Sequence, residues 1–135
     1  MSLGYGGTCR RIAEDSQWVS YEYAVYNLNV LEYEGKKELF DGEIEIRKSA
    51  LIEPEIRETI KRFPGGRRKR ITKRIIREVP IVELLEKGEI RITECSHSWQ
   101  WMDFGCEYIA YRLVNKIFQY YQENDILPEV ESCHF

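Results

Sequence analysis

The first half of the chain alternates apolar and polar side chains with the two-residue period of β-strands. Residues 17–33 are rich in aromatic and β-branched side chains and contain neither Gly nor Pro, which predicts a long strand. YEGKKE then favours a turn, and residues 38–51 alternate Ile44 and Ile46 with charged side chains, which predicts a second strand. Gly42 indicates a β-bulge in it. We therefore expect a long antiparallel hairpin with one face in water.

Helical spacing of apolar side chains occurs further along the chain. Residues 53–63 carry Pro54 in a position suited to a first helical turn and place three apolar side chains on one face, which predicts a short helix. A second short helix is expected to end at Gly88. Residues 102–124 repeat apolar side chains every three to four positions over six turns, which predicts the main helix, with Asp103 or Ser98 as its cap.

These patterns define the expected fold class as α+β. We expect a single domain with an antiparallel sheet of three to five strands, among them residues 89–96, and a long C-terminal helix packed on one face. One or two short helices complete it. We assign residues 1–15 to a flexible N-terminal segment, 16–127 to the domain and 128–135 to a C-terminal tail.

Charge is distributed unevenly along the 135 residues, whose formal net charge is −3. Residues 61–78 contain nine basic side chains and one acidic side chain, so this segment carries +8, whereas residues 1–60 carry −5 and residues 79–135 carry −6. A separated basic segment indicates either an anionic partner or charge pairing within the fold.

The basic segment fits both regular periods. As a helix, residues 67–79 would follow the helix over 53–63 and give an approximate helix-turn-helix. As a strand, they would alternate apolar and basic side chains. Ile71, Thr72 and Ile75 are β-branched, and the segment lacks Ala and Leu, so we favour the strand. Pairing with the strand that contains Glu43 and Glu45 would then neutralise its charge inside the fold.

Charge left unpaired on this segment would be available to a partner. The leading interpretation is a small non-enzymatic cytoplasmic binding module whose basic surface takes a nucleic acid or an acidic protein. No glycine-rich phosphate loop, no ribonucleoprotein-type aromatic motif and no other family motif is evident. The candidate binding residues are Arg67, Arg68, Lys69, Arg70, Lys73, Arg74 and Arg77.

A second interpretation is a metal-binding or hydrolytic enzyme centred on Cys95, His97, Asp103 and Cys106. Glu94 and Glu107 would add acid–base groups, and Cys133 and His134 further ligand types. The spacings do not form a Cys-x2-Cys pair, so we expect no metal, no cofactor and no catalytic residue.

A third interpretation is a structural homodimer. Six tyrosines on the first strand and the main helix could form a protein–protein surface; they are Tyr21, Tyr23, Tyr26, Tyr33, Tyr120 and Tyr121. We expect no membrane partner because no apolar run approaches the ~18 to 20 residues that span a bilayer. No secretory signal is expected, so the cytoplasm is the predicted compartment and the four cysteines are predicted to be free thiols.

Overall fold

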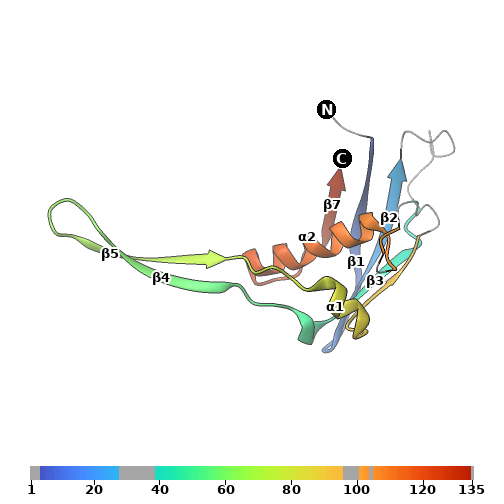
Figure 1. Ribbon diagram of the computed structural model, residues 1–135, viewed down its shortest axis with the longest axis horizontal. Helices are drawn as coiled ribbons and strands as arrows, with labels where there is room; N and C mark the ends of the chain where they lie inside the picture. Colours follow the sequence, from blue (N-terminus) through green and yellow to red (C-terminus); the bar gives the residue numbers. More distant parts are fainter. Residues whose placement is uncertain (1–3, 28–38, 96–100, 104, 135) are drawn as a thin grey trace.

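The computed structural model describes residues 4–27, 39–95, 101–103 and 105–134. Among these residues, five antiparallel strands form one sheet in the order β6-β3-β2-β1-β7, and β4 pairs with β5 in a separate two-stranded ribbon that projects far from the body (Figure 1). The elements follow in chain order as β1 (Tyr5–Glu14), β2 (Trp18–Asn27), β3 (Gly42–Arg47), the 3-10 helix η2 (Lys48–Ala50), β4 (Glu55–Arg62), β5 (Arg68–Ile75), α1 (Ile81–Glu86), β6 (Ile90–Thr93), α2 (Tyr108–Asn124) and β7 (Val130–His134). The predicted α+β single domain is confirmed.

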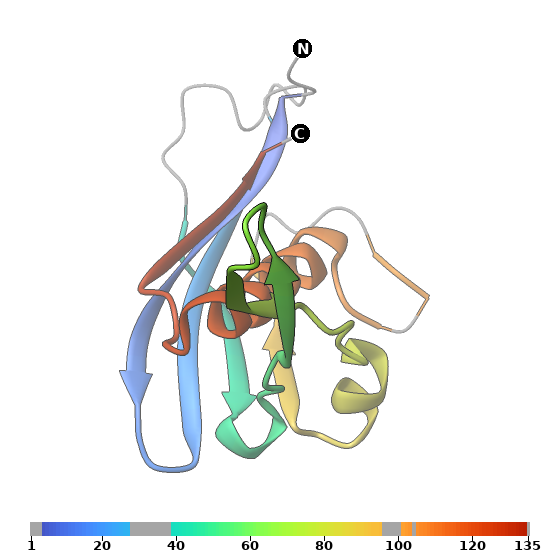
Figure 2. The ribbon, with the colours of Figure 1, turned by 90° about the vertical axis from the view of Figure 1, so that its left-hand side faces the viewer.

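The core lies between the sheet and α2, which crosses one face of it (Figure 2). The predicted apolar stripe of the long helix is buried, and Leu113, Ile117 and Phe118 are fully inaccessible to solvent. Strand β2 contributes Tyr21 and Tyr23 to the opposite side of this core, both also fully buried. Burial of this apolar area is the main contribution to the stability of the body.

Residues 1–15 were predicted to be a flexible segment, but residues 5–14 form β1, next to the centre of the sheet. The glycines that suggested a loop are required by close packing. A Cβ on Gly7 would lie 2.5 Å from Cγ2 of Ile109, and one on Gly6 would lie 2.1 Å from the carbonyl oxygen of Cys133. Glycine at these two positions therefore allows α2 and β7 to approach the strand.

The predicted C-terminal tail, residues 128–135, also differs in the structure. Residues 130–134 form β7, an edge strand that pairs with β1 (Figure 2). The chain before it is fixed by the hydroxyl of Tyr21, which donates a 2.6 Å hydrogen bond to the carbonyl oxygen of Pro128. The domain therefore extends to both ends of the described chain.

The hairpin predicted over residues 17–51 is confirmed as the antiparallel pair β2–β3, and its predicted turn lies outside the described residues. The bulge predicted at Gly42 is not seen, because the β2–β3 ladder reaches this residue, its last pair, without a register shift. Gly42 instead lies against the ring of Tyr23, where a Cβ would come within 2.4 Å of the ring. The register shift lies in β1, between Arg11 and Ala13.

The long helix begins later than predicted. Residue 108 is its first, and Glu107 rather than Asp103 precedes it as the cap residue, while Ser98 lies outside the described residues. Gly105 has a φ of 85°, a conformation incompatible with a continuous helix from residue 102. The predicted short helix and the strand that follows it are confirmed as α1 and β6, separated by Gly88 with a φ of 72°.

Candidate functional site

The most distinctive surface is the ribbon formed by β4 and β5, residues 55–75, which we call the β-arm (Figure 1). Its register is regular from the pair Glu55–Ile75 to the pair Arg62–Arg68, and Gly65 and Gly66 form its turn with φ values of 93° and 83°. The helix predicted over 53–63 is therefore wrong, since Ile56, Ile60 and Thr59 are β-branched and pair as a strand. The strand predicted within 67–79 is confirmed over residues 68–75.

The predicted pairing of the basic strand with acidic side chains is also wrong. Glu43 and Glu45 belong to β3, which lies between β2 and β6, and Glu45 is opposite Arg91 of β6. The β-arm forms its own sheet, apart from these acidic residues. Its charge is therefore not neutralised by the acidic strand of the body.

The β-arm concentrates positive charge. Residues 55–75 contain nine basic and two acidic side chains, a net charge of +7, so the rest of the chain carries −10. Three cross-strand pairs place like charges directly opposite each other: Arg57 with Lys73, Lys61 with Lys69, and Arg62 with Arg68. Directly opposed like charges destabilise a sheet, and a lone two-stranded ribbon is only marginally stable.

Few of these cations are neutralised. Within the described part of the chain, the salt bridges along the ribbon itself are Arg57 to Glu55, at 2.9 Å, and Arg70 to Glu58, at 3.8 Å. Both pairs are exposed to solvent and contribute little. Six basic side chains of the β-arm form no hydrogen bond or ion pair with any described residue; they are Lys61, Arg62, Arg67, Arg68, Lys69 and Lys73.

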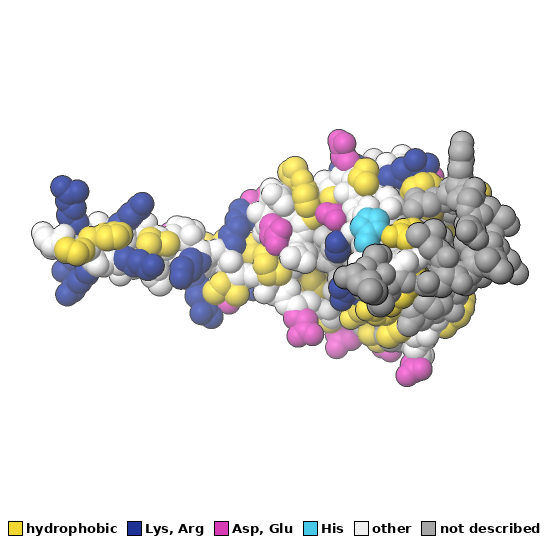
Figure 3. Space-filling model, turned by 90° about the horizontal axis from the view of Figure 1, so that it is seen from above, with side chains coloured by type: hydrophobic (Ala, Val, Ile, Leu, Met, Phe, Trp, Pro, Cys, Tyr) yellow, Lys and Arg dark blue, Asp and Glu magenta, His cyan; other side chains and the backbone are white. Residues whose placement is uncertain are grey.

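Basic side chains project from both sides of the ribbon (Figure 3). Successive residues of a strand point to opposite faces, so the register assigns each pair to one face. The odd face carries Arg57, Lys61, Lys69 and Lys73. The even face carries Arg62, Arg68, Arg70 and Arg74. Each face also has one glutamate, Glu55 or Glu58, so the net charge is +3 on either side.

The root of the β-arm is attached to the C-terminal end of α2. The side-chain amide of Gln122, which is fully buried, accepts a 2.7 Å hydrogen bond from the backbone N–H of Arg77 and donates a 3.0 Å bond to its carbonyl oxygen. The hydroxyl of Tyr121 donates a 2.5 Å bond to Glu53, which raises the pKa of the tyrosine to about 12. Both strands of the arm are thus anchored on the same helix end.

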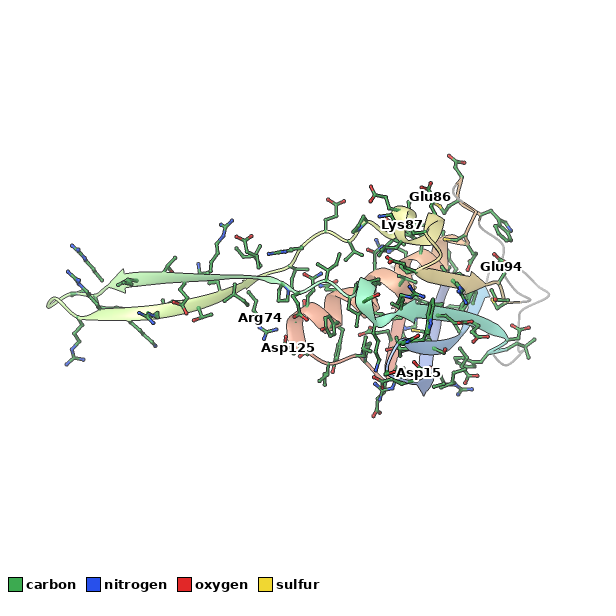
Figure 4. All side chains as sticks on the ribbon, turned by 90° about the horizontal axis from the view of Figure 1, so that it is seen from below. Asp15, Arg74, Glu86, Lys87, Glu94 and Asp125 are labelled. Carbon is green, nitrogen blue, oxygen red and sulfur yellow. The ribbon has the colours of Figure 1, made fainter. Side chains whose placement is uncertain are left out.

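Arg74 completes this anchor. Its guanidinium forms an ion pair with Asp125, the residue that caps α2, and donates a 2.8 Å bond to the carbonyl oxygen of Gln122 (Figure 4). The hydrogen bond from Arg74 lowers the pKa of the Asp125 carboxyl. A cation at the C-terminal end of a helix also interacts favourably with the helix dipole. Arg74 therefore fixes the direction in which the arm leaves the body.

The structure divides the seven predicted binding residues into two groups. Arg67 lies in the turn, and Arg68 to Arg70 with Lys73 lie exposed on β5. Arg74 and Arg77 lie at the root. Sequence reasoning missed Arg57, Lys61 and Arg62 of β4, because it assigned them to a helix. The two β-branched runs on either side of Pro-Gly-Gly were the signal of a hairpin.

The alternative site around Cys95 and Cys106 does not assemble among the described residues. Both thiols are buried, Asp103 is exposed, and His97 lies outside the described residues. No group of three or more potential metal ligands occurs within the part of the chain that the structure describes. Burial raises the pKa of the Cys106 thiol to about 11, which keeps it protonated and weakly nucleophilic.

Glu107, which follows Cys106, has an unusual environment. Its side chain is fully buried, and neither carboxyl oxygen has a hydrogen-bond partner among the described residues. Burial is the largest influence on this carboxyl and raises its pKa to about 7. We interpret Glu107 as a carboxyl that is costly to ionise at the start of α2.

The predicted tyrosine surface is not formed by the first strand, because Tyr21 and Tyr23 lie in the core; Tyr33 lies outside the described residues. A homodimer remains a prediction. Among the described residues, no helix is both long enough and apolar enough to cross a membrane.

The fold and this surface together define an α+β domain that carries a basic two-stranded arm. Comparisons with protein-family models, curated proteins and solved structures find no significant match for the chain.

Proposed function

We propose that the protein is a non-enzymatic nucleic-acid-binding module that acts in the cytoplasm and uses the β-arm as its binding surface. The observation that carries this proposal is the ladder of directly opposed basic pairs on a projecting ribbon. The repulsion within this ladder would be relieved by a partner that supplies closely spaced negative charges. Nucleic acid does so, since duplex DNA carries one phosphate charge about every 1.7 Å along its axis.

The acidic body supports the same proposal. The rest of the chain carries −10, so phosphates are repelled from the body and attracted to the arm (Figure 3). This separation restricts contact to one element and one orientation. An acidic protein is the alternative partner, but its surface would face only one side of the ribbon, whereas both sides here are equally basic.

Two matched variants test the proposal. The arm variant replaces Arg68, Arg70 and Lys73 by Gln, and the body variant replaces Arg47, Lys87 and Arg91, which are exposed on the sheet and beside α1. Fluorescence anisotropy with a labelled 20-base-pair duplex at 0.1 M salt should show a loss of affinity on the order of tenfold to a hundredfold for the arm variant. The body variant removes as much charge but away from the arm, so it should bind within about threefold of the wild type.

Equal losses in the two variants would mean that net charge alone governs binding, and the proposal would fail. Binding to poly-glutamate but to no nucleic acid at the same salt concentration would identify an acidic protein as the partner instead.

A further inference from the structure

This inference rests on the proposed function and names the nucleic acid. We infer that the β-arm lies in the major groove of B-form duplex DNA, between the two phosphate ridges. Positive charge is distributed over both faces of the ribbon. Each face of the ribbon carries four basic side chains, and on each face at least two have no partner among the described residues. A flat anionic surface would leave one of these faces in water. A groove has phosphates on both sides and would contact both.

The dimensions of a two-stranded ribbon also match the major groove of B-form DNA. Neighbouring strands lie about 4.8 Å apart, and a layer of strands with its side chains is about 10 Å thick. The major groove of B-form DNA is about 12 Å wide and admits a two-stranded ribbon, whereas the minor groove, at about 6 Å, does not. The major groove of A-form RNA is too narrow and deep for side chains to read. Width therefore selects duplex DNA and its major groove.

The length of the arm sets how many base pairs it can contact. Each strand of the arm has eight residues, which at about 3.3 Å per residue gives a ribbon about 26 Å long. This length corresponds to about eight base pairs at about 3.4 Å each.

Because its root is anchored on α2, the arm would enter the groove in one defined orientation relative to the body. Gln122 and Asp125 hold the base of β5 on α2, so the ribbon leaves the body in a defined direction and need not be ordered entirely on binding (Figure 4). The body, which carries most of the negative charge, is thereby kept beyond the end of the contacted segment.

The test compares the two faces. One variant replaces Lys61, Lys69 and Lys73 by Gln on the odd face, and the other replaces Arg62, Arg68 and Arg70 on the even face. Both remove opposed like charges, so neither is expected to unfold the ribbon, and circular dichroism would check this. Each should weaken binding to duplex DNA by a similar factor, within about threefold of each other, and lower the salt slope by about three.

Dimethyl sulfate methylates guanine N7 in the major groove and adenine N3 in the minor groove. Protection of one of these atoms by the protein therefore identifies the groove that it occupies. Wild-type protein should protect N7 over about eight base pairs and leave N3 reactive, and it should bind duplex DNA at least tenfold more tightly than duplex RNA or single strands. Loss of binding in only one face variant, protection of N3 alone, or equal affinity for duplex RNA would overturn the inference and leave the proposed function standing. Failure to bind any nucleic acid would contradict both the major-groove inference and the proposed function.

Discussion

Replacing Glu107 by Gln should stabilise the protein by about 3 kcal/mol at pH 8 and by less than about 0.5 kcal/mol at pH 4.5. Burial raises the pKa of this carboxyl from 4.5 to about 7. Between these two values the folded state retains a proton that the unfolded state has released. Stability therefore falls as the pH rises through this window and stays at its lower level above pH 7.

Glutamine has the shape of the protonated carboxyl and no charge, so the stability of the variant does not fall with pH between 4.5 and 7. Urea unfolding at both pH values measures the effect, and Glu86→Gln, at an exposed position of α1, is the control. If Glu107→Gln raised the free energy of unfolding by the same amount at both pH values, our description of Glu107 would be contradicted. Ionisation of the buried carboxyl would then not be what destabilises the wild type.

Replacing Gln122 by Ala should lower the free energy of unfolding by about 2–3 kcal/mol and loosen the root of the β-arm. The variant leaves the backbone N–H and carbonyl of Arg77 without their partners and opens a void where the fully buried amide was. Denaturant unfolding gives the stability. Amide exchange should be faster at residues 74–77 than in the wild type, while exchange in the five-stranded sheet should change much less.

Gln119→Ala is the matched control, since Gln119 lies on the same helix and is exposed, and among the described residues its side chain donates a single hydrogen bond, to Glu123 at 3.0 Å. It should change stability by less than about 0.5 kcal/mol. If the two alanine variants were equally stable, the anchor at the root of the arm would have to be discarded.

Local patterns predicted much of the body. Alternation in residues 18–27 and 42–47 predicted the central hairpin, and the helical stripe through Ile109, Leu113 and Ile117 predicted the covering helix. The predicted secondary structure was wrong where a residue is needed for packing against residues far away in the sequence. Gly6 and Gly7 resemble loop residues until the positions of Cys133 and Ile109 are known, because only these neighbours explain the missing side chains.

The candidate site was predicted in part. Charge alone identified the cations of β5, and β-branched residues favoured a strand there. The partner strand was misassigned because Ile56 and Ile60 are spaced by four, which fits a helix as well as alternate positions of a strand. Which strand pairs with which is a long-range property, so the isolation of the arm from Glu43 and Glu45 could not be derived from local sequence.

If phosphates bind the β-arm, the dependence of duplex DNA affinity on salt concentration shows it most directly. The logarithm of the binding constant should fall linearly with the logarithm of the salt concentration, with a slope of about −5 to −7, if six to eight arm cations contact phosphates. The body variant should keep this slope, and the arm variant should lose about three units of it. A slope near zero, or one that is equal in both variants, would contradict the proposal that the arm is the binding surface.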